Sequence, residues 1–192
     1  FGAGSAIGAL DCLNVPFHFG VVLDPSPPRE RFLKRFDCLA PLFYQSALAH
    51  ELFMHVEGDS FCFDGMGSFP LSDFFFKQVG LSLPSFEAGW NVLNFAVHIA
   101  TFLGCNPIIC VGMDGCVENE EVYARGATHL GETIERQKVD VTPCVDRFGN
   151  KVFSRSDFLM GKQWLKAFAT THSDRRFINA SSKGLRFDGF EE

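Results

Sequence analysis

Two aspartates stand where an apolar run of the sequence ends, which is the position at which α/β proteins place polar groups that contact ligands. Asp24 follows the run at residues 19–23, and Asp114 follows the run at residues 108–111. An aspartate in such a place either forms a turn or grips a ribose, a metal ion or a substrate hydroxyl. We take both aspartates as candidate site residues.

A helix predicted just before the second strand brings further candidates to the same edge. Residues 90–103 are almost all apolar, apart from a narrow stripe formed by Asn91, Asn94, His98 and Thr101. A helix that precedes a parallel strand runs antiparallel to it, so its first residues share an edge with Asp114. Free N–H groups and the helix dipole suit an anion there. Gly89, Asn91, Asn94 and Gly112 are therefore candidate ligand contacts, although the two asparagines fit a helix cap and a buried amide equally well.

A polar stretch later in the chain holds the best candidate for acid or base chemistry. Residues 118–146 are charged and too long for a plain connection, so we expect a lid or a substrate loop. His129 lies in this stretch and titrates near neutral pH, which suits proton transfer as well as a solvated loop position. We expect no metal site, because His50, Glu51 and His55 lack the zincin spacing and no C-x-x-C pair occurs.

Composition excludes several classes of protein. The chain has 192 residues, 46% of them hydrophobic and 23 of them Phe, which excludes disorder. Its net charge of −6 disfavours a nucleic-acid surface. No apolar run reaches the ~18–20 residues of a membrane span without a polar break. The seven cysteines are an odd number and several lie in apolar runs, which indicates buried thiols in a reducing cytoplasm.

The remaining patterns predict an α/β chain with a mainly parallel sheet in three layers. We expect strands at residues 19–25, 41–46, 60–63, 108–111 and 177–180, the fourth of them covered on both faces. We expect helices at 5–13, 29–36, 71–79, 90–103 and from Ser154 or Ser156 to 171, and a hairpin turn at 146–150. The helix at 71–79 carries three successive Phe and is expected to cover the core. No strand precedes the glycine stretch at residues 1–5 in this sequence, so we do not assign that stretch to a phosphate loop.

Four segments together resemble one known family. The segments are Ser5-Ala-Ile-Gly-Ala-Leu with Val21-Val-Leu-Asp-Pro25, Gly89-Trp-Asn-Val with Pro107-Ile-Ile-Cys-Val-Gly-Met-Asp114, Tyr123-Ala-Arg-Gly126, and Phe177-Ile-Asn-Ala-Ser-Ser-Lys-Gly184. They are similar to motifs of the motility accessory factor group, whose domain is shared with archaeal 6-hydroxymethylpterin diphosphokinases. The sequence departs from that family at Met113, where Gln is common, and at Ser182-Lys183, where Glu-Gly is common.

The resemblance implies a Rossmann-like fold related to bacterial sialyltransferases, spanning residues 1–192 as one domain. It implies that the chain is a fragment, because the family's first strand and Gly-x-Gly-Pro-Ser loop are expected ahead of residue 1. It also adds Tyr123 and Asn179 to the candidate substrate contacts. The candidate catalytic residues, chosen from their positions and chemistry, are Asp114 and His129.

Three functions follow from the resemblance. The first is a transferase that uses a CMP-activated nonulosonic sugar and a hydroxyl acceptor, needs no metal, and contacts ribose or hydroxyls through Asp24 or Asp114. The second is transfer of diphosphate from ATP to a pterin alcohol, with Mg²⁺ held by the same two aspartates. The third is a degenerate domain without catalysis that binds a nucleotide or a partner. A patch of exposed Phe side chains would support this function. All three functions are compatible with a homo-oligomer.

Overall fold

The computed structural model describes residues 1–23, 40–45, 48, 56–64, 70–84, 86–117 and 141–192. The described residues fall into two compact units. Unit 1 lies within Phe1–Ala88, and unit 2 lies within Gly89–Val122 and Thr133–Glu192. Of the predicted features, the helix at 29–36 and the candidate residues Asp24, Tyr123 and His129 lie outside the described residues.

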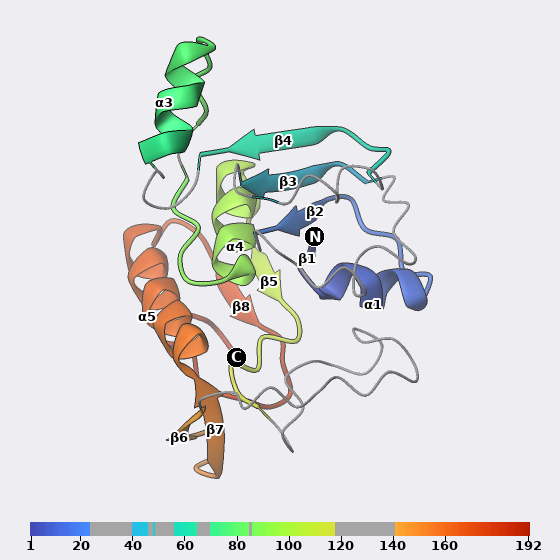
Figure 1. The fold of residues 1–192 in the computed structure, drawn as a ribbon. Helices are drawn as coiled ribbons and strands as arrows, with labels where there is room; N and C mark the ends of the chain where they lie inside the picture. Colours follow the sequence, from blue (N-terminus) through green and yellow to red (C-terminus); the bar gives the residue numbers. More distant parts are fainter. Residues whose placement is uncertain (24–39, 46–47, 49–55, 65–69, 85, 118–140) are drawn as a thin grey trace. The chain divides into compact units, whose positions relative to one another are not determined.

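Unit 1 is built on a parallel sheet, as predicted. Its strands are β1 (Gly2–Ala3), β2 (Gly20–Val22), β3 (Leu42–Gln45) and β4 (Ser60–Phe63), in the order β1-β2-β3-β4 (Figure 1). All three pairings are parallel, and Val21 lies opposite Phe43, which lies opposite Phe61. Helix α1 (Ala6–Cys12) follows β1. The expected strands at 19–25, 41–46 and 60–63 and the helix at 5–13 are thereby confirmed, although the Ser5 side chain makes no capping bond.

The glycine stretch at residues 1–5 contains a strand, β1, which the sequence analysis did not predict. Gly2 and Ala3 pair with β2, where the N–H of Gly2 donates to the carbonyl of Phe19 at 2.8 Å. Gly4 then adopts a positive φ of 55°, which a residue without Cβ takes at no cost, and the chain turns into α1. The start of the chain is therefore a strand, a glycine turn and a helix. A strand of two residues is too short to show an alternating pattern in the sequence.

The two faces of the unit 1 sheet carry different side chains. One face packs the aliphatic residues Ile7, Val22, Leu42 and Leu48. Rings line the other: Phe43 stacks on Phe61 with centroids 5.1 Å apart and meets Phe63 at 5.8 Å. Because Val21, Phe43 and Phe61 are in register, their side chains point to the same face. Part of the unusual Phe content therefore serves this sheet.

Helix α3 (Pro70–Gln78) exists as predicted, but it does not cover the core. Phe74 is 54% exposed and Phe75 56%, and Leu71 and Val79 are also exposed. The two rings meet edge to face at 5.6 Å, so they contact each other rather than the sheet. Helical spacing of apolar residues predicts an apolar stripe, but it does not specify what the stripe packs against.

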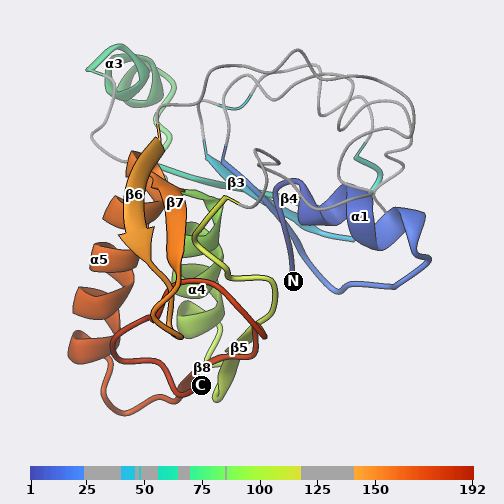
Figure 2. The same ribbon diagram turned by 90° about the horizontal axis from the view of Figure 1, so that it is seen from below.

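Unit 2 contains the longest helices and a second parallel pair. Its elements are α4 (Val92–Phe102), β5 (Ile108–Cys110), β6 (Val141–Val145), β7 (Lys151–Arg155), α5 (Ser156–Thr171) and β8 (Phe177–Asn179) (Figure 2). Strands β5 and β8 are parallel, with Ile108 opposite Phe177. The buried core of the unit includes Val97, Ala100, Ile108, Leu165, Phe168, Phe177 and Leu185. These elements confirm the predicted strands at 108–111 and 177–180 and the two predicted helices.

Strand β5 was expected to be covered on both faces, and this was wrong. Ile108 and Cys110 are buried, whereas Ile109 is 56% exposed and Val111, just beyond the strand, is 82% exposed. Three apolar residues in a row cannot distinguish a strand buried on two faces from one with a single buried face. Burial raises the pKa of the Cys110 thiol to about 12, so this cysteine is an inert, protonated core residue.

The serines expected to cap α5 have other roles. Arg155 occupies the cap position without a side-chain capping bond, and its guanidinium pairs with Asp157 at 2.9 Å instead. Ser154 is fully buried, and its Oγ donates to the carbonyl of Gly115 at 2.6 Å. This bond joins β7 to the segment that follows β5.

The predicted hairpin turn between β6 and β7 is confirmed and is organised by Asp146. One carboxylate oxygen accepts the N–H groups of Phe148 and Asn150, both at 2.8 Å, and the other accepts the side-chain amide of Asn150 at 3.0 Å. These bonds favour the ionised form, with the Asn150 side chain contributing most, and they lower the pKa of Asp146 below its ordinary 3.8.

A pH dependence of this turn follows from that lowered pKa. The support that Asp146 gives the turn should be present at pH values above 3.8 and should be lost as pH falls through the lowered pKa. We expect the carboxyl carbon of Asp146, followed by NMR, to titrate below pH 3.8. Asn150→Ala should shift that midpoint upward, and an unchanged midpoint in this variant would contradict the assigned cause.

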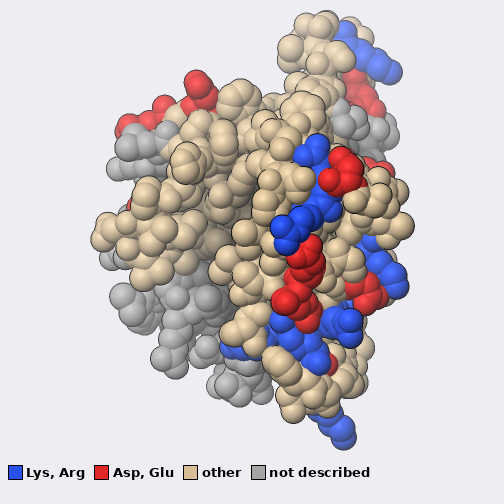
Figure 3. All heavy atoms as spheres, turned by 180° about the vertical axis from the view of Figure 1, so that it is seen from behind, with Lys and Arg blue, Asp and Glu red and all other residues tan. Residues whose placement is uncertain are grey.

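Charges of both signs are mixed on the surface. In the face seen in Figure 3, basic and acidic side chains alternate along one band. Exposed pairs in unit 2 include Lys166 with Asp188 at 3.0 Å and Arg176 with Glu191 at 2.8 Å. This face therefore offers no extended basic field of the kind that nucleic acids require. Within the described ranges, no helix is both long and apolar enough to span a bilayer.

Candidate functional site at the carboxyl ends of β5 and β8

The chain segments that leave β5 and β8 run side by side and bind each other through their backbones. The N–H of Ala180 donates to the carbonyl of Cys110, and the N–H of Leu185 donates to the carbonyl of Asp114, each at 2.8 Å. Two parallel strands thus deliver two of the predicted site residues, Asp114 and Asn179, to one edge of unit 2. Gly112 lies in the same connection, exposed and with a positive φ of 74°.

Gly184 fixes how closely the two segments approach. Its φ is +98°, and a Cβ at this position would overlap the backbone of Asp114. Only glycine satisfies both conditions, because an L side chain rarely adopts such a φ and any side-chain atom would push Asp114 away. The position of Asp114 therefore depends on a glycine that the sequence analysis did not single out as a site residue.

Asn179 presents hydrogen-bond donors at this edge that no atom of the described residues accepts. The residue is 2% exposed, and its Oδ1 accepts the N–H of Ser181 at 3.1 Å. Its Nδ2 is buried without a partner, and the same holds for Oγ of Ser181, a residue that is 8% exposed. Buried polar groups in proteins are nearly always paired, so two unpaired ones, at the last residue of β8 and two residues beyond it, call for an explanation.

Arg147 holds the far end of the same loop. Its backbone N–H donates to the carbonyl of Gly184 at 3.0 Å, and its guanidinium donates to the carbonyl of Lys183 at 3.4 Å. The guanidinium also lies 3.5 Å from a carboxylate oxygen of Glu192, while its Nε is buried and unpaired. Sequence reasoning missed both Arg147 and Ser181, because each lies in a turn whose letters indicate only loop structure.

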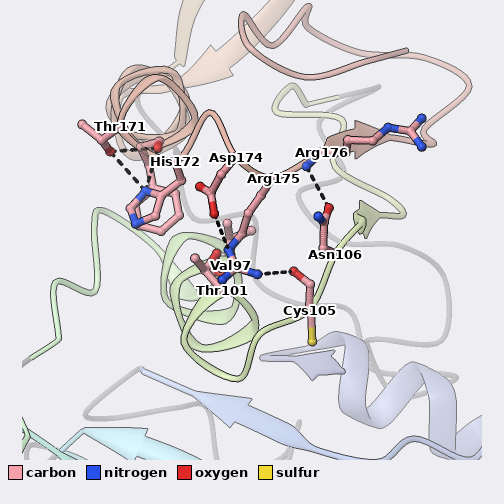
Figure 4. A network of polar contacts seen from close by, with 10 residues as sticks. Val97, Thr101, Cys105, Asn106, Thr171, His172, Asp174, Arg175 and Arg176 are labelled. Carbon is pink, nitrogen blue, oxygen red and sulfur yellow. Dashed lines mark hydrogen bonds and ion pairs between the residues drawn. The ribbon is translucent and has the colours of Figure 1, made fainter.

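Polar groups near the amino-terminal ends of the same strands are paired. Figure 4 shows Arg175 donating to the carbonyl of Cys105 at 3.1 Å and the N–H of Arg176 donating to Oδ1 of Asn106 at 3.0 Å. These bonds join the turn before β5 to the turn before β8. The polar groups at the carboxyl ends of β5 and β8, by contrast, include the unpaired atoms of Asn179 and Ser181. In unit 2 the carboxyl ends are therefore the better candidate for a ligand site.

The start of α4 is stabilised by the roles that the sequence left open for Asn91 and Asn94. Oδ1 of Asn91 accepts the N–H groups of Leu93 and Asn94, each at 3.1 Å, and so caps the helix. Asn94 is fully buried; its Oδ1 accepts the N–H of Trp90 at 2.9 Å and its Nδ2 donates to the carbonyl of Gly161 at 3.1 Å. The cap and the buried amide are thereby both present in the structure.

The close packing of Asn94 requires a glycine at position 89. Its φ is +65°, and a Cβ there would overlap the side chain of Asn94. The structure therefore brings the predicted residues Gly89, Asn91 and Asn94 together at the start of α4, where their observed contacts are with other residues of the protein.

Among the described residues, no group of three or more His, Cys, Asp or Glu side chains could hold a metal ion.

The arrangement places this chain among α/β proteins with mainly parallel sheets, and sequence comparison narrows the class. The family model described as 6-hydroxymethylpterin diphosphokinase MptE-like matches residues 1–120. The chain therefore belongs to the MptE-like family, in agreement with the resemblance noted in its motifs.

Two individual proteins are similar to the chain. An uncharacterized protein of Treponema pallidum (strain Nichols) is 31% identical over 99 residues, which are 52% of this chain and 34% of that protein. The structure of MAf glycosyltransferase from Magnetospirillum magneticum AMB-1 superposes with a TM-score of 0.72 and 17% identity, over 98% of this chain and 28% of that one. The structural match shows a shared fold. The chain spans about a third of the length of each protein.

Proposed function

We propose that this chain is a nucleotide-dependent transferase, in which a hydroxyl attacks an activated donor and a nucleotide phosphate leaves. The most specific form of the proposal is a glycosyltransferase-like activity with a CMP-activated nonulosonic sugar and a hydroxyl acceptor. The observation that carries it is the unpaired amide of Asn179 beside the Asp114 segment, at the carboxyl end of a parallel strand. The fold shared with MAf glycosyltransferase supports the same direction.

In this proposal each residue has a stated role. The acceptor hydroxyl attacks the anomeric carbon of the sugar, the bond from that carbon to the phosphate oxygen breaks, and CMP departs. Asp114 or His129 takes the hydroxyl proton as the base. Asp24 and Tyr123 contact the ribose or the acceptor, and the start of α4 at Gly89 and Asn91 faces the nucleotide.

A second function is favoured by the description of the family. Transfer of diphosphate from ATP to the alcohol of 6-hydroxymethylpterin would use the same exchange, in which a hydroxyl attacks phosphorus and AMP leaves. It requires Mg²⁺, because the metal neutralises the charge of the phosphates during transfer. Asp24 and Asp114 are the carboxylates that we propose to hold the ion in that case.

Ligand-induced stabilisation distinguishes these functions. We would measure thermal unfolding with CMP, CDP, ATP and GTP, each with and without Mg²⁺, because a ligand that binds only the folded chain raises Tm. A rise with CMP that does not need metal supports the glycosyltransferase-like function. A rise with ATP that requires Mg²⁺ supports the diphosphokinase-like function. No rise with any nucleotide would contradict both and leave a partner-binding domain.

Asp114 provides a more local test. We expect Asp114→Asn to lower the affinity for the nucleotide that stabilises the original chain about tenfold or more, because it removes a charge and an acceptor from the site. The free chain should unfold within a few degrees of the original Tm, since the backbone carbonyl that accepts the Leu185 N–H is retained. An unchanged nucleotide affinity in this variant would remove Asp114 from the site.

A further inference from the structure

Ser181 and Asn179 share a feature that a purely structural loop does not need. Nδ2 of Asn179 and Oγ of Ser181 are both buried, and neither has a partner in the part of the chain that the structure describes. An unpaired buried polar group is unfavourable, so the free chain carries a cost that a bound ligand would remove. Asn179 is the last residue of β8, and Ser181 follows it by two residues.

The hydrogen bonds around the pair define what a ligand must offer. Oδ1 of Asn179 is occupied by the N–H of Ser181, and this bond fixes which end of the amide carries the hydrogens. The pair therefore presents two amide hydrogens and one hydroxyl hydrogen, against a single hydroxyl oxygen as acceptor. A group rich in acceptor oxygens and poor in hydrogens matches this set.

Positive charge close to the pair favours an anion over a neutral carbonyl. Lys183 follows Ser181 by two residues, and the guanidinium of Arg147 donates to the Lys183 carbonyl. Arg147 also has a buried Nε without a partner. Arg147 belongs to the turn between β6 and β7 and is joined to this loop by that bond, and its guanidinium also lies 3.5 Å from a carboxylate oxygen of Glu192.

We propose that Nδ2 of Asn179 and Oγ of Ser181 jointly bind a phosphate group of the substrate. This inference rests on the proposed function for its ligand, the phosphate of the nucleotide donor. It extends that function to Ser181, which was not among the candidate site residues. Phosphate oxygens accept several hydrogen bonds at once, and hydrogen bonds to a charged acceptor are about twice as strong as neutral ones.

Ser181→Ala provides a sharp test, because removal of an unpaired hydroxyl should not harm the free protein. We expect its Tm without ligand to stay equal to the original or to rise. Its affinity for phosphate-containing ligands should fall about tenfold. The buried and paired Ser154 gives a matched control: Ser154→Ala loses the bond to the Gly115 carbonyl, so its Tm should fall while ligand affinity is kept.

Asn179→Asp tests the second atom. It keeps the acceptor for the Ser181 N–H and the shape of the side chain, but it replaces the two donor hydrogens with an oxygen that repels phosphate. We expect a loss of affinity at least as large as that of Ser181→Ala. Binding is measured by calorimetry at a temperature where every variant is folded, with CMP, ATP with Mg²⁺, cytidine, adenosine and inorganic pyrophosphate as ligands.

The set of ligands separates failure of this inference from failure of the proposed function. Weaker binding of a nucleotide or of pyrophosphate in both variants supports a phosphate site, and weaker binding of pyrophosphate alone supports it even if no nucleotide binds. Equal affinities in both variants and the original chain would overturn it. So would a loss that is as large for cytidine or adenosine as for the nucleotides, since the pair would then contact the nucleoside. Absence of binding by every ligand to the original chain would overturn it as well.

Discussion

Gly184→Ala is expected to lower the free energy of unfolding of unit 2 by about 3 kcal/mol, from backbone strain and overpacking together. The residue has a φ of +98°, and the new Cβ would overlap the backbone of Asp114. Relief of that overlap requires the loop to move away, which breaks the bond between the Leu185 N–H and the Asp114 carbonyl. The substitution should therefore also weaken nucleotide binding in whatever fraction remains folded.

Denaturant unfolding followed by tryptophan fluorescence measures this effect in the correct unit. The chain has two tryptophans, Trp90 and Trp164, and both lie in unit 2. Gly149→Ala is the matched control: its φ is +88°, but nothing lies within 4 Å of the added Cβ. It should cost only about 1 kcal/mol, from the backbone alone. If both variants lose the same stability, the close approach to Asp114 plays no part.

Local patterns were sufficient for the elements of unit 2. Helix α4 begins at the cap that Asn91 provides and ends shortly before Gly104 and Pro107, and the letters of those residues carry the signal. The hairpin is equally local, since Asp146 accepts bonds only from residues two to four positions away. Interactions of this kind can be recognised in a sequence because both partners lie in one short window.

Contacts between distant segments could not be predicted in this way. The amide of Asn94 meets a glycine carbonyl 67 residues later, and the backbone of Asp114 meets Gly184. Both glycines look like ordinary loop or helix residues until the fold places them. The free donors of Asn179 and Ser181 are a further case, because only coordinates reveal that a buried group has no partner. The same limit explains α3, whose apolar stripe was recognised and whose exposure was not.

The role of Asn94 yields the other large effect. Asn94→Ala should lower the free energy of unfolding of unit 2 by about 3 kcal/mol, since it removes two hydrogen bonds made by a buried side chain. The Trp90 N–H loses its acceptor and the Gly161 carbonyl loses its donor, at a residue with no solvent exposure. A small cavity adds to the loss. Because the bond to Gly161 joins α4 to α5, both tryptophans should report one cooperative loss.

Asn106→Ala is the control for this prediction, because it removes a similar hydrogen bond between distant segments at an exposed asparagine. Oδ1 of Asn106 also accepts a backbone N–H from a distant segment, that of Arg176 at 3.0 Å, but Asn106 is exposed and water replaces the lost partner. Its removal should cost about 1 kcal/mol or less. The difference between the two variants measures what burial adds to the same type of bond. Equal losses in both would mean that Asn94 does not hold α4 against α5, and that packing of the apolar core alone determines how the two helices meet.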